Sequence, residues 1–82
     1  MGTQRFDKPV RIRFGKPGKT FLVTSVGEAR NCLRSDKWPA RPGPKQRFAH
    51  ESLLAAMAGT ATPVEARCAF VDAASEARIL AM

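Results

Sequence analysis

The chain has 82 residues, 44% of them hydrophobic, and a formal net charge of +7. A single domain of this size has a thin core, which excludes the deep substrate pocket of a large enzyme. Residues 1 to 47 carry twelve Lys and Arg against three Asp and Glu, whereas residues 48 to 82 carry two against four, and such a basic half either attracts polyanions or forms a soluble surface.

Localisation and redox state follow from two features of the sequence. No apolar run approaches the roughly 18 to 20 residues of a membrane span. The N-terminus also lacks the apolar core of a signal peptide. We therefore expect a cytoplasmic protein, in which Cys32 and Cys68 are free and buried thiols instead of a disulfide.

The first predicted unit is an antiparallel β-hairpin. In PVRIRF, residues 9 to 14, apolar and arginine side chains alternate with the period of a strand that has one solvated face. The turn sequence GKPGK follows, and TFLVTS then predicts a second strand over residues 20 to 24. Residues 1 to 8 are predicted to be a tail, and residues 9 to 80 one domain.

Two helices are predicted after the hairpin. Ser25 and Glu28 form an S-x-x-E capping box, which predicts a helix over residues 25 to 34. A second helix is predicted over residues 46 to 58, ended by Gly59 in the left-handed conformation. The side chains of this second helix expected to face the core are Phe48 or Ala49, Leu53, Ala56 and Met57.

The third helix has the clearest start. In TPVE, Thr62 is the predicted cap, Pro63 the first helical residue and Glu65 the partner that completes a capping box. We expect the helix over residues 63 to 78. Its inner face is predicted to consist of Ala66, Ala69, Phe70, Ala73, Ala74 and Ala77.

Together these elements predict an α+β fold, in which the hairpin packs against three helices. An isolated hairpin is marginal in water, so its apolar face must rest on the helices or be extended by another strand. If one strand edge is free, pairing across a homodimer would cover it.

The segment DKWPARPGPKQR, residues 36 to 47, is the most distinctive stretch of the sequence. Its three prolines each fix a backbone angle, so the segment loses little entropy when it is ordered. One interpretation is a rigid strap, with Trp38 covering the gap between helices. The other is a ligand-binding loop that uses its basic side chains.

Polyanion binding is the corresponding hypothesis for the basic residues. Lys and Arg that neutralise phosphates give salt-sensitive affinity without sequence preference. The hairpin offers no row of aromatic side chains on which bases would stack. The candidate residues are Arg11, Arg13, Lys16, Lys19, Arg41, Lys45 and Arg47.

The sequence contains no recognisable catalytic or metal-binding set. His50, the single histidine, lies about 100° around the helix from Glu51, so the two side chains do not share a face. One histidine and two distant cysteines have no metal-ligand spacing. GKPGKT, residues 15 to 20, lacks the first glycine of a phosphate-binding loop. We therefore expect neither enzyme activity nor a cofactor.

Four segments, PVRIRF, VTSVGEARNCL, KWPARPGPKQRFAHESLLAAMAG and TPVEARCAFVDAASEARI, resemble a known family in order and spacing. The family is domain of unknown function 982, and the resemblance covers residues 9 to 79. It implies a small α+β fold and no established activity. It also favours a packing role for the residues it shares with the family, which include Trp38, Pro39, Gly43 and Phe70.

The sequence therefore favours a small non-enzymatic module that binds a protein partner or a second copy of itself. The alternative is a protein that binds nucleic acid or another polyanion through its basic half.

Overall fold

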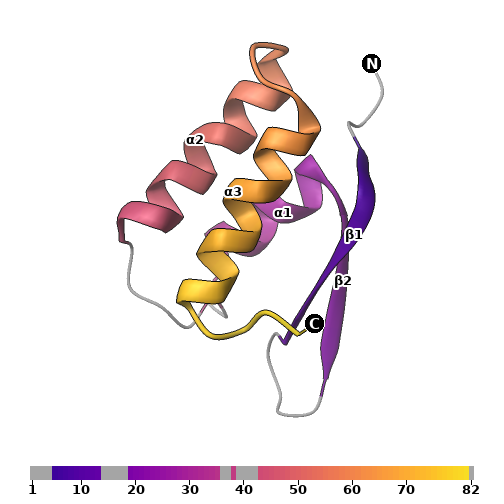
Figure 1. Cartoon of the computed structure of the whole chain (residues 1–82), viewed down its shortest axis with the longest axis vertical. Helices are drawn as coiled ribbons and strands as arrows, with labels where there is room; N and C mark the ends of the chain where they lie inside the picture. The colour runs from indigo at the N-terminus through magenta and orange to yellow at the C-terminus, as the bar shows by residue number, and fades with distance from the viewer. Residues whose placement is uncertain (1–4, 14–18, 36–37, 39–42, 82) are drawn as a thin grey trace.

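The computed structural model describes residues 5–13, 19–35, 38 and 43–81. It has the predicted α+β architecture, an N-terminal antiparallel hairpin followed by three helices (Figure 1). The elements are β1 (Arg5–Arg13), β2 (Thr20–Ser25), α1 (Val26–Arg34), α2 (Pro44–Ala58) and α3 (Pro63–Glu76).

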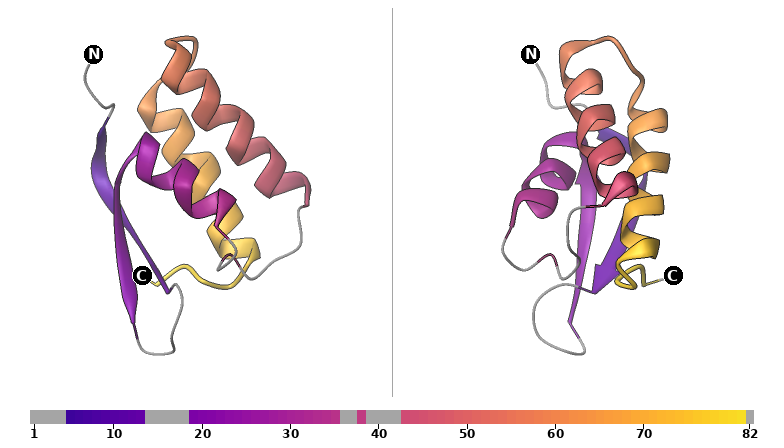
Figure 2. Two further views of the ribbon diagram at one scale, coloured as in Figure 1. Left: turned by 180° about the vertical axis from the view of Figure 1, so that it is seen from behind. Right: turned by 90° about the vertical axis from the view of Figure 1, so that its left-hand side faces the viewer.

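The sheet and the helices form stacked layers. Helix α3 packs on β1 and α1 packs on β2, so both cover the same face of the hairpin. Helix α2 packs on α3 and α1, farther from the sheet (Figure 2). The core between the layers is filled by side chains from every element, the largest fully buried ones being Phe70, Ile12, Leu53, Val10, Val23 and Val26.

Strand β1 begins at Arg5, four residues before the predicted start, so residues 5 to 8 of the predicted tail belong to the strand. The reason is Phe6, which is buried in the core. The register shifts between Arg5 and Val10. Such an irregularity interrupts the alternation of apolar and polar residues. The first residues of the strand therefore lack the period-2 pattern by which a strand is predicted.

The C-terminal segment adds a pairing that the sequence did not predict. The amide of Arg13 donates to the carbonyl of Ile79 at 2.6 Å, and the amide of Ala81 donates to the carbonyl of Arg11 at 2.9 Å. An antiparallel bridge joins Ile12 to Leu80 between them. β1 therefore has neighbours on both edges, the C-terminal segment on one and β2 on the other (Figure 1).

The predicted capping signals locate the helices to within two residues. Ser25 caps α1, and Thr62 with Glu65 forms the complete capping box of α3. Gly59 ends α2 with φ 86°, in the left-handed region that glycine favours. Helix α2 starts at Pro44, two residues earlier than predicted, because proline fits the first turn.

Met57 and Cys68 were predicted to be buried, and both predictions are wrong. The choice between Phe48 and Ala49 as the core residue of α2 is decided for Ala49. Ala49 is buried while its neighbour Phe48 is 60% exposed. Met57 is exposed, because it lies at the outer margin of the face that α2 presents to α1 and α3. Cys68 is also exposed, since it lies off the alanine-rich face of α3, so the prediction of two buried thiols holds only for Cys32.

Trp38 is 7% exposed, and its ring centroid lies 5.8 Å from that of Phe70 on α3. Gly43 is the N-cap of α2. Pro39 lies outside the described residues. A buried indole against the centre of α3 agrees with a covering role for this tryptophan and leaves little of its ring for a ligand.

Candidate functional site

Among the residues that the structure describes, strand β2 pairs with β1 along one edge and with no strand along the other, which is its open edge. Because the polar backbone groups of Arg11 and Arg13 face the C-terminal segment, those of Ile12 and Val10 face β2. Their partners across the hairpin are Phe21 and Val23. The alternation of an antiparallel ladder then directs the amide and carbonyl groups of residues 20, 22 and 24 away from β1, toward the open edge.

Glu28 closes one end of this edge. Its carboxylate accepts from the amide and from the hydroxyl of Thr24, both at 2.7 Å. The bond from the Thr24 amide lowers the pKa of Glu28, helped by the Thr24 hydroxyl and the charge of Arg5. In the described part of the chain, Thr20 and Leu22 are therefore the β2 residues whose outward amide and carbonyl both have no partner.

The capping box predicted for α1 is thus present only in part. Ser25 Oγ accepts from the amide of Glu28 at 3.2 Å, as expected. The carboxylate of Glu28 binds Thr24 instead of returning to the cap residue. The reason is the strand that precedes the helix, because the amide of Ser25 faces β1 whereas that of Thr24 faces Glu28.

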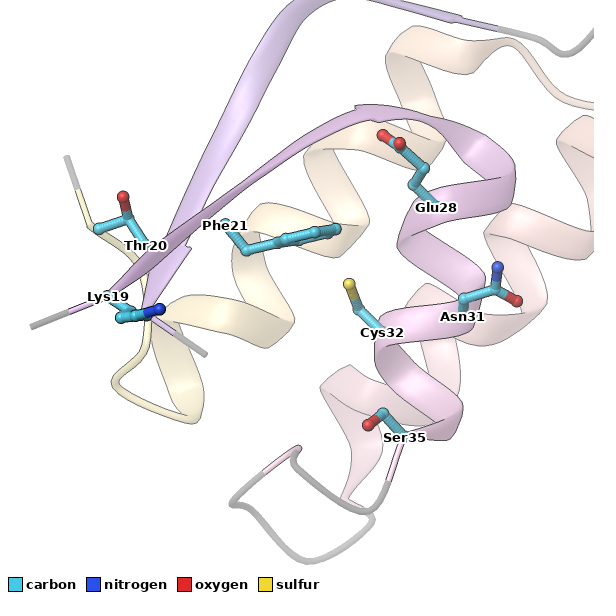
Figure 3. A pocket seen from close by; sticks show the side chains of 7 residues that line it. All are labelled: Lys19, Thr20, Phe21, Glu28, Asn31, Cys32 and Ser35. Carbon is cyan, nitrogen blue, oxygen red and sulfur yellow. The ribbon is translucent and has the colours of Figure 1, made fainter. Parts of the chain in front are cut away.

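A groove of about 560 Å³ lies between the open edge of β2 and helix α1. The ring of Phe21 extends from β2 toward α1, and the thiol of Cys32 points to it from the helix (Figure 3). Lys19 and Glu28 lie toward opposite ends of the groove (Figure 3). The full lining is Lys19, Thr20, Phe21, Glu28, Asn31, Cys32 and Ser35.

Large apolar side chains are exposed on both faces of β2 at this edge. Phe21, opposite buried Ile12, lies on the helix-facing side and is 42% exposed. Leu22, opposite Arg11, lies on the outer side and is 48% exposed. A sheet edge that combines open backbone groups with exposed apolar side chains is a template for another strand.

The thiol in the groove is not a nucleophile. Burial, together with the negative charge of Glu28, raises the pKa of Cys32 to about 11. A thiol reacts as its thiolate, so Cys32 stays protonated and inert at neutral pH. Among the residues that the structure describes, no three His, Cys, Asp or Glu side chains gather in a way that could hold a metal ion.

The basic residues predicted to bind polyanions lie in separate places. Arg11 and Arg13 are exposed on the outer side of β1, and Lys19 lines the groove. Lys45 and Arg47 are exposed in the first turn of α2, which Figure 1 places on the other side of the helical layer from the hairpin. The remaining two candidates, Lys16 and Arg41, lie outside the described residues.

No helix in the described part of the chain has the length and apolar character needed to cross a membrane.

His50 and Glu51 are adjacent residues of α2. His50 is half-buried and Glu51 is exposed.

A model of the family described as "Protein of unknown function (DUF982)" matches residues 8–81. The chain belongs to this family. The DUF982 match extends from β1 to the C-terminal segment, so it includes β2, α1 and the groove between them. The search of curated proteins found no match to the chain. The search of solved structures found none either.

Sequence reasoning identified neither the groove nor the residues that line it from α1, which are Glu28, Asn31, Cys32 and Ser35. One signal was present. Phe21 and Leu22 are adjacent in a strand, and adjacent strand residues face opposite sides of a sheet. One of these two apolar side chains must therefore face away from the helices, so the pair predicts an exposed apolar side chain on this strand.

Proposed function

We propose that this DUF982 protein is a non-enzymatic interaction module of the cytoplasm, which binds an extended polypeptide strand on the open edge of β2. The observation that carries the proposal is the outward backbone of Thr20 and Leu22 beside the groove. Strand addition uses the backbone groups for affinity and a neighbouring pocket for every second side chain.

The chemistry of the groove supports binding over catalysis. Its thiol is protonated at neutral pH, and its carboxylate is held by two hydrogen bonds to Thr24. Neither group is poised as a nucleophile or a base. The apolar ring of Phe21 and the open backbone groups are suited to a peptide backbone with apolar side chains.

Site-specific photo-crosslinking tests this function. A benzophenone amino acid at Phe21 should form covalent adducts with a polypeptide in living cells, because the bound strand would lie against the ring. The matched control is the same substitution at Phe48, which is 60% exposed on α2, away from β2. Adducts at position 21 in clear excess over position 48 support the function, and equal or absent adducts at position 21 contradict it.

A further inference from the structure

We propose that the strand which adds to β2 is β2 of a second copy of this chain, antiparallel to the first, about a two-fold axis that passes between the two Phe21 residues. This inference rests on the proposed function and names its partner. The product would be one continuous sheet across two subunits, with helices α1 and α3 of both copies on the same face.

The open backbone groups select this register. With Phe21 on the axis, Thr20 of each copy lies opposite Leu22 of the other, and each such pair exchanges both of its hydrogen bonds. The outward amide and carbonyl groups of Thr20 and Leu22 are then all used. With Leu22 on the axis, Thr20 would instead lie opposite Thr24, whose amide is already held by Glu28.

The side chains agree with the same axis. Two Phe21 residues on the axis form a non-hydrogen-bonded pair, the closer kind, with Cα atoms about 4.5 Å apart. Both rings lie on the helix-facing side, where the two grooves merge into one. Each ring is 42% exposed in the single chain and would be covered by the other, as aromatic pairs across strands stabilise a sheet.

The charges at the ends of the groove are also self-complementary. Lys19 lies at one end of the strand and Glu28 beyond the other (Figure 3). Rotation about the proposed axis brings each Lys19 toward the Glu28 end of the other copy. Donors, acceptors, apolar rings and charges of both signs thus all come from one surface, which is what an interface with two-fold symmetry requires.

Disulfide trapping tests both the partner and the register. The Phe21→Cys substitution, in a background of Cys32→Ala and Cys68→Ser, should give a disulfide-linked dimer under mild oxidation, because a bridge requires Cα atoms within about 7 Å. Leu22→Cys in the same background should not, since these residues would lie two positions out of register. Phe48→Cys on α2 controls for random collision. Circular dichroism verifies that each variant is folded.

A second measurement avoids any change of cysteine. Sedimentation equilibrium of the natural chain should show a monomer–dimer equilibrium. Leu22→Pro should weaken this association about tenfold or more, because each dimer loses two hydrogen bonds. The Leu22 amide faces the open edge, so proline there leaves the ladder to β1 intact. Val64→Lys, at an exposed apolar residue of α3, should not change the equilibrium.

The outcomes separate this inference from the proposed function. Trapping at position 21 with a dimer sensitive to Leu22→Pro supports the inference. Trapping at position 22 instead contradicts the register. A natural chain that stays monomeric, with photo-adducts at Phe21 to a different polypeptide, overturns self-pairing and leaves the interaction function in place. A monomer without adducts overturns both.

Discussion

Replacing Phe70 with alanine should lower the free energy of unfolding by about 3–5 kcal/mol. Phe70 is fully buried at the centre of α3 and contacts the ring of Trp38. Its removal forfeits the burial of the ring and leaves a cavity beside the indole, which the alanine-rich surroundings cannot fill. Since small domains have a total stability of about 5–15 kcal/mol, the variant should be close to unfolding.

Urea unfolding followed by circular dichroism measures this change. The matched control is Phe48→Ala, because Phe48 is an exposed phenylalanine on a neighbouring helix. Its substitution should change the free energy of unfolding by about 0.5 kcal/mol or less. Equal effects of the two substitutions would contradict the core described above.

Deleting residues 79 to 82 should lower the free energy of unfolding by about 2.5–6 kcal/mol. The deletion removes buried Ile79, worth about 1.5–3 kcal/mol. It also removes two backbone hydrogen bonds to β1, each worth about 0.5–1.5 kcal/mol. β1 would then have an unpaired edge of its own.

A point substitution separates the two contributions. Ala81→Pro removes the amide that donates to the carbonyl of Arg11 but keeps Ile79, so it should cost about 1 kcal/mol. Urea unfolding measures both variants. A deletion that leaves the free energy of unfolding unchanged within 1 kcal/mol would show that the C-terminal segment does not stabilise the sheet.

The helices were predictable because their signals are local. The Thr62 capping box, the left-handed Gly59 and the Ser25 cap each depend on a few consecutive residues. Hydrogen bonds of this kind form within one turn of helix and hardly depend on the rest of the fold. The alternation in residues 9 to 14 similarly predicted the inner and outer sides of β1 as far as Arg13, and residue 14 lies outside the described residues.

The strand pairing of the C-terminus was not predictable, because its cause is distant in sequence. Residues 79 to 81 are too short to show a strand period, and their partner is β1 at the other end of the chain. The start of β1 at Arg5 was hidden by the irregular register that follows it. In both cases tertiary contacts decide the conformation of residues that have no local signal.

The candidate site depends on this missed pairing. The C-terminal segment covers one edge of β1 and β2 covers the other, so within the described ranges the open edge of the sheet belongs to β2. The sequence predicted that a free edge would favour self-association, and it supplied Lys19 as a candidate residue. It did not indicate which edge is free or that α1 lies beside it.

Amide hydrogen exchange measured at several protein concentrations tests self-pairing through β2 most directly. The amides of Thr20 and Leu22 should become more protected as the concentration rises, because each would donate to the other copy only in the dimer. The amides of Val23, which faces β1, and Thr24, which donates to Glu28, should keep the same protection throughout. Exchange at Thr20 and Leu22 that stays fast and independent of concentration up to the millimolar range would contradict pairing through β2.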